Sequence, residues 1–595
     1  MSTAILTGQP VPGSSIEGDL RSLGFDVRVA VDAADAERLV AEAPCEQRIA
    51  LVDARFVGHV HALRLGLTDP RFSLAAVPGA VTAQPDGRVI LTRALARENS
   101  AGGGTAVAVD SLPDRIVTAL ADDGAEVYRP ELGSLVATVP VDPQARNEAR
   151  QAVADVDDEA VRLKSAVKSR DGFFTTHFIS PYSRYIARWC ARRGLTPNQV
   201  TTASLITALI AAACAATGTR GGFVAAGVLL IASFVLDCTD GQLARYSLQY
   251  STLGAWLDAT FDRAKEYAYY AGLALGAARG GDDVWALALG AMILQTCRHV
   301  VDFSFNEANH DATANTSPTA ALSDKLDSVG WTVWVRRMIV LPIGERWAMI
   351  AVLTAVTTPR ITFYVLLVGC AFAATYTTAG RVLRSLTRKA QRTDRAAKAL
   401  ADLADNGPLA GLLARVARAP LGAPFLVALA GTAVLAVALF SGVTWAPVAG
   451  AVVYAIAAAQ ALHRPLKGVL DWLVPPVFRA AEYGTVLVLA AKADVNGALP
   501  AAFGLVAAVA YHHYDTVYRI RGNAGAPPAW LVRAVGGQEG RTLLVTVAAA
   551  VLTASQFTVA LTVLAVAVAL VVLVESIRFW VSAGAPAVHD EGETA

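Results

Sequence analysis

Residues 237–245 read Asp237-Cys238-Thr239-Asp240-Gly241-Gln242-Leu243-Ala244-Arg245, and after an interval of eight residues come Gly254, Asp258 and Asp262. On an α-helix, positions 237, 240, 241, 244 and 245 lie along one stripe, because they are spaced by three or four residues. Positions 254, 258 and 262 are spaced by fours and share one face of a second helix. The spacing therefore predicts two neighbouring helices that bring four carboxylates together.

The residue types in this group indicate a metal and a phosphate. Carboxylates at membrane depth are costly unless they are paired or bound to a cation, so they are candidates for function. Ligands that are all oxygen favour a hard cation, Mg²⁺ or Mn²⁺, and four carboxylates suit two such ions. The small residues Gly241, Ala244 and Gly254 leave room for a ligand beside the backbone. Arg245 carries a charge that matches phosphate.

A purely structural role for the same residues is the alternative. Small residues promote helix packing, and the acids have three nearby cations with which to pair, namely Arg245, Arg263 and Lys265. Eight fixed positions at fixed spacing would arise by chance on the order of 10⁻⁸ of the time over this chain. The pattern therefore favours a functional site.

The composition of the whole chain is that of a membrane protein. Of its 595 residues, 54% are hydrophobic and 17% are charged, against about 45–50% and about 25% in soluble domains. The net charge of +1 gives no basic surplus of the kind that nucleic-acid binding requires. The 6 cysteines are scattered without the CxxC spacing of a zinc site or the density of a disulfide scaffold. We expect an integral membrane protein that binds no nucleic acid.

Long apolar runs begin near residue 200, and about 20 apolar residues cross a bilayer. Basic residues follow most of the even-numbered runs, which places both termini, and the aspartates, on the cytosolic side of the cytoplasmic membrane. We expect about twelve transmembrane helices in two six-helix halves, with the last long run broken at Ser555–Gln556. The candidate spans are 199–217, 222–243, 253–277, 283–303, 346–357, 361–380, 421–441, 444–462, 475–492, 499–517, 542–554 and 557–575.

The first 160 residues are predicted to form a soluble α/β head, because short apolar runs alternate with helix-like stretches. The loop after the first strand lacks the glycine-rich, arginine-containing pattern that would hold a triphosphate. We therefore expect a Rossmann-like or degenerate nucleotidyltransferase-like domain without catalysis. Residues 161–400 are expected to form one membrane domain, and residues 401–595 a second one of unknown role. The expected strands are Thr3–Leu6, Phe25–Val31, Arg48–Val52, Val89–Thr92 and Thr105–Val109.

The aspartate pattern resembles the signature of the CDP-alcohol phosphotransferases, D-x2-D-G-x2-A-R-x8-G-x3-D-x3-D, and every specified position matches. The resemblance covers roughly residues 160–395. It implies a six-helix core in which an acceptor hydroxyl attacks the phosphorus bonded to the alcohol and CMP leaves. The implied metal ligands are Asp237, Asp240, Asp258 and Asp262, the last also being the general base. The implied nucleotide-binding residues are Asn198, Gly241, Ala244, Arg245 and Gly254.

Two further segments resemble the subgroup that includes di-myo-inositol phosphate phosphate synthases. They are Lys164 with Arg170-Asp171-Gly172-Phe173, and Leu341-Pro342-Ile343-Gly344-Glu345-Arg346. Arg336, Arg337 and Arg346 are candidates to hold a phosphate of the acceptor. The alternative is that these are ordinary basic residues at a cytosolic membrane interface.

Several functions remain open on the sequence. A phospholipid synthase that uses CDP-diacylglycerol competes with a transferase that uses a CDP-polyol, such as CDP-inositol, and a phosphorylated acceptor. Outside this class, twelve spans and the polar residues of the second half would also suit a transporter, and the head would suit a non-catalytic scaffold. Membrane lipids are expected neighbours, and the resemblance makes a homodimer an expectation.

Overall fold

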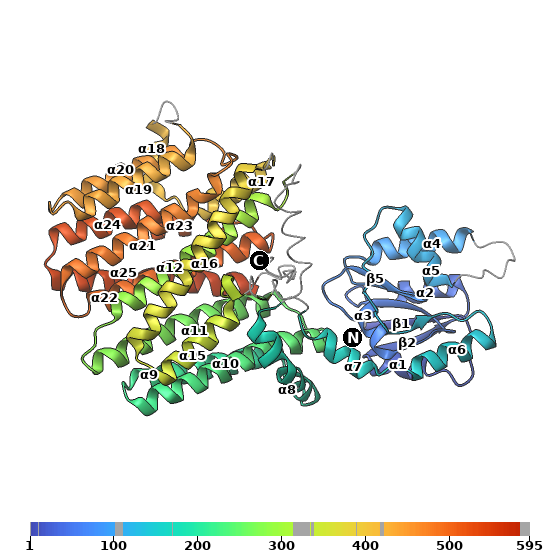
Figure 1. Cartoon of the computed structure of the whole chain (residues 1–595). Helices are drawn as coiled ribbons and strands as arrows, with labels where there is room; N and C mark the ends of the chain where they lie inside the picture. The colour runs from blue at the N-terminus through green and yellow to red at the C-terminus, as the bar shows by residue number, and fades with distance from the viewer. Residues whose placement is uncertain are drawn as a thin grey trace. The chain divides into compact units, whose positions relative to one another are not determined.

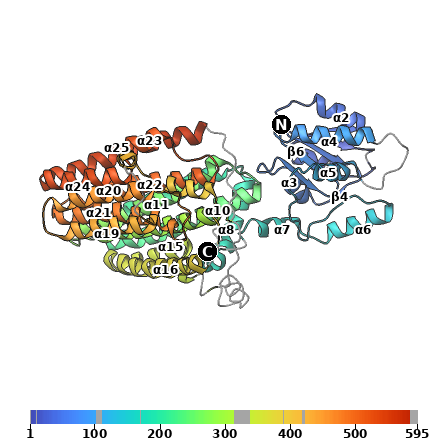
Figure 2. The same cartoon turned by 90° about the horizontal axis from the view of Figure 1, so that it is seen from above.

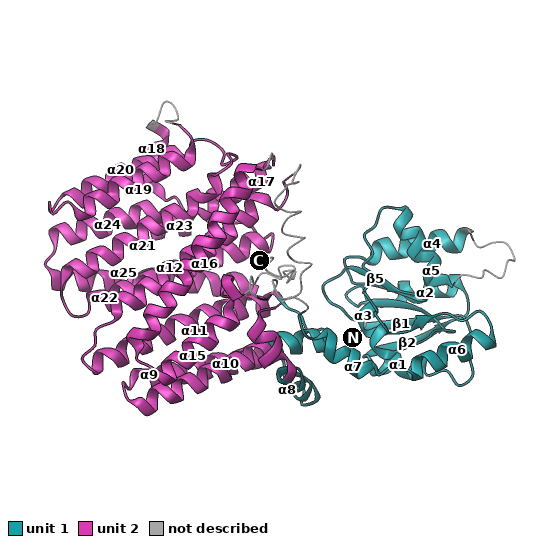
Figure 3. Cartoon of the chain, viewed as in Figure 1, with its two compact units in different colours: residues 1–169, 182–197, 239–251 teal, residues 170–181, 198–238, 252–595 magenta. Residues whose placement is uncertain are grey.

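The computed structural model describes residues 2–9, 11–101, 111–168, 171–312, 334, 338–387, 390–416 and 422–582. The chain divides into two compact units (Figure 3). Unit 1 comprises Met1–Ser169, Tyr182–Pro197 and Thr239–Ser251. Unit 2 comprises Arg170–Pro181, Asn198–Cys238 and Thr252–Ala595.

Unit 1 contains a five-stranded sheet in the order β2-β1-β3-β6-β5. Strands β1, β2 and β3 are parallel, whereas β6 runs antiparallel to both β3 and β5. The central strands are buried on both faces, as expected for a sheet with helices on each side. This α/β architecture is the one predicted for the head. The strands are β1 (Ser2–Thr7), β2 (Phe25–Ala30), β3 (Ile49–Asp53), β5 (Leu74–Val77) and β6 (Ala80–Ala83).

Helices cover both faces of this sheet (Figures 1 and 2). One face packs against apolar side chains of α2 (Ala33–Glu42), α4 (Arg88–Ala101) and α5 (Leu112–Asp122). The other face packs against α1 (Ile16–Ser22) and α3 (Val60–Leu67). The alternation of apolar runs and helix-like stretches in the sequence therefore corresponds to a sheet with helices on both faces.

One predicted strand of the head is wrong. Residues 89–92 lie in helix α4, where Leu91, Ala94 and Leu95 are fully buried while Val89 is 66% exposed. That burial follows a helical period of three to four residues, which a window of four residues is too short to reveal. The expected strand Thr105–Val109 lies outside the described residues.

Two contacts involve polar residues near the ends of the first and third strands of the head. Asp53, at the end of β3, pairs with Arg55, whose Nη2 lies 2.9 Å from Asp53 Oδ2. Helix α6 (Pro143–Ala154) reaches the loop after β1, where Arg150 Nη2 donates to the carbonyl of Gly13 at 3.0 Å. These side chains make contacts within the head.

His61 makes the head sensitive to acid. It is 4% exposed in α3, and its ring nitrogens have no hydrogen-bond partner among the described residues. Burial, together with Arg162 and Arg64 nearby, lowers the pKa of His61 to about 4. The unfolded imidazole titrates near pH 6.5, so the unfolded head binds more protons between these values and stability is lost as the pH falls from about 6.5 to about 4.

We expect hydrogen exchange of residues 60–67 in the full chain to accelerate over this pH range, after correction for intrinsic exchange. The His61→Leu variant should be much less sensitive, because leucine has no proton to gain. Helices of unit 2 serve as the internal control. An acid response in the variant equal to that of the wild type would show that another group is responsible.

Unit 2 is helical, and each of the twelve predicted spans coincides with a helix (Figures 1 and 2). The first six are α9 (Pro197–Ala216), α10 (Arg220–Ser247), α11 (Thr252–Arg279), α12 (Trp285–Asn309), α15 (Ile343–Val356) and α16 (Pro359–Thr387). The second six are α19 (Pro424–Phe440), α20 (Ala446–Ala461), α21 (Val474–Ala493), α22 (Ala498–Arg521), α24 (Gly537–Val551) and α25 (Ala554–Ser582). Shorter helices include α17 (Asp394–Leu403), α18 (Pro408–Val416) and α23 (Ala529–Val535).

Five helical segments of the described chain are long and apolar enough to cross a membrane, and α19 and α20 are shorter apolar helices. Several long apolar helices indicate an integral membrane protein, while the number of twelve spans stays a prediction. The five segments are Pro197–Ala216, Arg220–Ser247, Pro359–Thr387, Asp471–Ala493 and Ala554–Ser582.

The break in the last apolar run falls at Leu552–Thr553, slightly before the predicted Ser555–Gln556. Thr553 Oγ1 accepts a hydrogen bond from the backbone N–H of Gln556 at 3.4 Å, and Gln556 Oε1 accepts one from Thr553 N–H at 3.1 Å. This reciprocal pair begins α25 in the manner of a capping box. The helix boundary therefore follows the capping threonine.

The C-terminal helices pack directly on α11 and α12 of the first half. Trp256 of α11 stacks on Trp580 of α25, with ring centroids 6.2 Å apart. Phe305 of α12 meets Trp472 edge-on at 5.2 Å. Aromatic contacts of this kind bury large apolar surfaces, so the two halves form one helical body within unit 2.

Candidate functional site

Three of the four predicted aspartates form a cluster that is able to hold a metal ion. Asp237 and Asp240 lie one turn apart on α10, and Asp258 lies on α11. Each offers one carboxylate oxygen, and these oxygens lie within 4.8 Å of one another. Asp240 is 4% exposed, Asp237 is half-buried and Asp258 is exposed. The cluster thus has one buried ligand and one exposed ligand, and its three carboxylates form a donor set that suits Mg²⁺ or Mn²⁺.

The turn between α10 and α11 contains a backbone conformation that residues other than glycine rarely adopt. Helix α10 ends at Ser247, and Leu248 follows with a φ of +53° in the left-handed region. The N–H of Gln249 donates to the carbonyl of Ala244 at 3.0 Å and satisfies one of the last acceptors of the helix. A left-handed leucine costs about 1–2 kcal/mol. The strain lies directly after the aspartate stripe of α10.

The fourth aspartate, Asp262, is held by a lysine. Lys265 Nζ lies 2.9 Å from Asp262 Oδ1 and also pairs with Asp237 Oδ1. A third acceptor is Ser204 Oγ of α9, at 3.2 Å. The sequence offered pairing with Lys265 as a structural alternative, and for Asp237 and Asp262 this pairing is present. Ser204 gave no signal beyond being a polar residue in an apolar helix.

The predicted nucleotide-binding residues of α10 share its aspartate face. Arg245 Nε donates to the carbonyl of Ala166 at 2.6 Å. A Cβ at Gly241 would lie 3.5 Å from both terminal nitrogens of Arg245, so the guanidinium lies along the helix beside Gly241. Gly254 lies in the first turn of α11, one turn before Asp258. Asn198 is half-buried in the first turn of α9.

Of the three arginines predicted to bind the acceptor, only Arg346 lies among the described residues. Arg346 is 2% exposed, and its Nε lies 3.3 Å from Glu266 Oε1. Arg336 and Arg337 lie outside the described residues. Glu266 also takes a hydrogen bond from Arg263 Nη1 at 3.0 Å. Glu266, which the sequence did not single out, thus forms ion pairs with two arginines, four residues after Asp262.

The two segments that resembled the inositol-phosphate subgroup contact each other. Glu345 Oε1 accepts a hydrogen bond from the N–H of Phe174 at 3.2 Å. Any side chain at Gly172 would run into the Glu345 carboxylate, and one at Gly344 would run into Thr175. The glycines therefore permit a close approach of the lead-in segment to the start of α15.

Comparison with known protein families supports the reading of the aspartate motif. Residues 194–374 match the family model for CDP-alcohol phosphatidyltransferase. The chain therefore contains a CDP-alcohol phosphatidyltransferase domain, which indicates a transferase enzyme. Residues 394–595 match a family of unknown function (DUF5941).

Curated relatives are similar to part of the chain. A phosphatidylinositol phosphate synthase of Streptomyces avermitilis is 34% identical over 131 residues, which are 21% of this chain and 51% of that protein. A protein of the same name from Mycolicibacterium smegmatis is 36% identical over 122 residues, 20% of this chain and 53% of that protein. A bifunctional IPC transferase and DIPP synthase of Aquifex aeolicus is 31% identical over 114 residues, 19% of this chain and 26% of that protein. The chain thus spans about half the length, or less, of these relatives.

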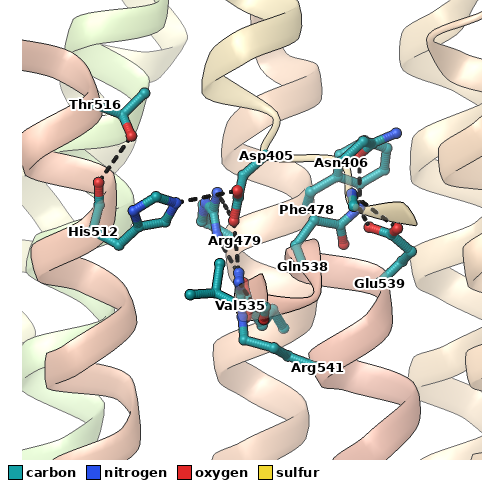
Figure 4. A network of polar contacts seen from close by, with 12 residues as sticks. Asp405, Asn406, Phe478, Arg479, His512, Thr516, Val535, Gln538, Glu539 and Arg541 are labelled. Carbon is teal, nitrogen blue, oxygen red and sulfur yellow. Dashed lines mark hydrogen bonds and ion pairs between the residues drawn. The ribbon is translucent and has the colours of Figure 1, made fainter. Parts of the chain in front are cut away.

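The C-terminal half contains a second group of buried charges, shown in Figure 4. Asp405 accepts from Arg541 Nη2 at 2.7 Å and lies 3.0 Å from Arg479 Nη2. Glu482 accepts from Arg479 Nη1 at 2.8 Å and from Arg541 Nε at 2.5 Å. His512 Nε2 lies 3.4 Å from Asp405 Oδ1. Two acids and two arginines compensate each other, so this group fits a structural network.

Proposed function

We propose that the chain transfers a phosphate-linked alcohol from a CDP-alcohol to an acceptor hydroxyl and releases CMP. The observation that carries the proposal is the convergence of Asp237, Asp240 and Asp258 oxygens within 4.8 Å, inside the segment that matches the family. These three aspartates would hold Mg²⁺ or Mn²⁺. When bound, the ion neutralises the charge of the leaving CMP.

In this reaction Asp262 is the general base. The acceptor oxygen forms a bond to the phosphorus that carries the alcohol, and the bond from that phosphorus to the CMP oxygen breaks. The hydroxyl proton goes to Asp262, whose carboxylate Lys265 holds at 2.9 Å. Arg245 would pair with the diphosphate of the donor, while Gly241, Ala244 and Gly254 admit it to the helix surface and Asn198 contacts the nucleotide.

For the substrates, we propose a CDP-diacylglycerol donor and a phosphorylated inositol acceptor. Support comes from the two relatives named phosphatidylinositol phosphate synthase. Transfer from CDP-inositol is the second candidate, which the Aquifex aeolicus relative favours. Arg336 and Arg337 remain proposed acceptor-phosphate ligands. Because Arg346 pairs with Glu266, we propose that Arg346 acts on the acceptor only if this pair opens.

The proposed arrangement in the cell follows the basic residues of the sequence. The head (1–160) and the aspartates face the cytosol, followed by a transferase membrane domain (161–400) and a C-terminal membrane domain (401–595). A homodimer remains an expectation from the family resemblance.

The product distinguishes the two donors. Purified full-length protein in detergent is given tritiated inositol phosphate, Mg²⁺ or Mn²⁺, and either CDP-diacylglycerol or CDP-inositol. We expect label in the organic phase with CDP-diacylglycerol, together with an equal amount of CMP. Label in a new water-soluble diester with CDP-inositol would transfer the proposal to the second candidate. CMP from neither donor would favour a transporter or a scaffold.

A further inference from the structure

Lys265 places a buried ammonium group between Asp237 and Asp262 of the candidate site. Its side chain is 1% exposed, while Asp237 and Asp262 are 14% and 17% exposed. A lysine ammonium has three hydrogens to donate. Lys265 Nζ donates to Asp237 Oδ1 and to Ser204 Oγ, and it lies 2.9 Å from Asp262 Oδ1 as an ion pair. Three oxygens thus surround the ammonium group, two as hydrogen-bond acceptors and one as an ion-pair partner.

Ser204 is itself held by hydrogen bonds between α9 and α10. Ser204 Oγ of α9 donates to the carbonyl of Ser233 on α10 at 2.8 Å, and Ser233 Oγ donates to the carbonyl of Ser204 at 2.9 Å. This reciprocal pair joins α9 to α10 at the level of Lys265. A buried ammonium is costly without its partners, so these contacts stabilise Lys265 in this position.

We propose that the ammonium group of Lys265 takes the place of a second divalent ion between Asp237 and Asp262. The chain then binds a single ion, through Asp237, Asp240 and Asp258. This inference rests on the proposed function, because it concerns the same metal-dependent site. It identifies Lys265 as a positioning residue that sets the number of ions.

Geometry and charge support the replacement. An ion that bridged Asp237 and Asp262 would need oxygens at about 2.0–2.1 Å for Mg²⁺, and so it would occupy the space that Lys265 Nζ fills. The ammonium also neutralises part of the negative charge of Asp237 and Asp262, so this pair attracts a second ion less strongly. The remaining three-carboxylate cluster is the one whose oxygens all lie within 4.8 Å.

The ammonium group of Lys265 fixes the position of the Asp262 carboxylate. The carboxylate is held in one orientation whether or not metal is present, so its position as general base does not depend on loading a second ion. Asp262 is then not needed for metal binding, which separates its proposed role from those of the other three aspartates.

The number of bound ions tests the proposal without measuring catalysis. Mn²⁺ is titrated into full-length wild-type protein in detergent, and free Mn²⁺ is followed by electron paramagnetic resonance. We expect one tightly bound ion in the wild type, two in Lys265→Met, and one in Lys265→Arg, which restores the charge. Lys492→Met is the matched control, because Lys492 lies on α21 and bonds to the carbonyl of Leu439; it should bind one ion.

The same Mn²⁺ titration of the Asp262→Asn variant gives a second test, which does not depend on how well the Lys265 variants fold. One ion in both the wild type and this variant supports the proposal, because Asp262 is then not a ligand. Two tightly bound ions in the wild type, falling to one in Asp262→Asn, would overturn it and leave the proposed function standing. One ion in a folded Lys265→Met protein would also overturn it. No bound Mn²⁺ in the folded wild type would contradict the metal-dependent function itself.

Discussion

Replacing Asp262 by asparagine is expected to slow CMP release about 10²–10⁴-fold, the usual contribution of a general base. Asparagine has nearly the same shape as aspartate but cannot accept the hydroxyl proton. Lys265 would keep Asp237 and Ser204 as acceptors, so the fold should survive. The measurement is the initial rate of CMP release at saturating donor and metal, beside bound Mn²⁺ measured on the same preparation.

Asp282→Asn is the matched control for this substitution. Asp282 lies in the turn after α11, at the other end of that helix from Asp258, and pairs with Arg360 on the surface. Its loss should change the rate by less than about twofold, because exposed ion pairs contribute about 0–1 kcal/mol. Normal turnover in Asp262→Asn would show that another group accepts the proton.

Replacing Arg479 by methionine is expected to destabilise the C-terminal half by about 3–5 kcal/mol, the typical cost of breaking a buried ion pair. Arg479 is fully buried and is shared by Asp405 and Glu482. Its removal leaves two buried acids with Arg541 as their shared arginine partner. The measurement is the thermal or denaturant midpoint of the full chain in detergent, followed by tryptophan fluorescence.

Two variants sharpen this prediction. Arg360→Met removes an arginine from a partly exposed pair with Asp282, and we expect it to cost at most about 1 kcal/mol. The double variant Arg479→Met with Glu482→Leu should recover part of the loss, because it removes one of the stranded acids along with the arginine. An Arg479→Met protein as stable as the wild type would show that the network contributes little to folding.

The features that were predictable from the sequence are those with a local period. Asp237 and Asp240 share a face because a helix has 3.6 residues per turn, and α10 and α11 carry the motif as expected. Long apolar runs likewise predict helices, because in lipid each segment must satisfy its backbone N–H and C=O groups by hydrogen bonds of its own. The prediction of a strand at Val89–Thr92 was wrong. Four residues are too few to distinguish a period of two residues from a period of 3.6 residues.

The partners of side chains could not be predicted, because they depend on which helices meet. Arg346 follows a segment that suggested acceptor binding, yet its guanidinium contacts Glu266 from another helix. Lys265 was one of three cations near the aspartates, and only the packing of α11 beside α9 gives it Ser204 as a further acceptor. The choice between a structural and a functional reading is thus not exclusive, because Lys265 pairs with acids that are themselves candidates for chemistry.

The most direct measurement is CMP release by the wild-type chain from CDP-diacylglycerol and inositol phosphate, with Mn²⁺ present and then removed by a chelator. The account predicts release that stops on chelation and returns when Mn²⁺ is added back. Release that continues unchanged without metal would contradict it. So would a folded, Mn²⁺-loaded protein that releases no CMP from this donor or from CDP-inositol.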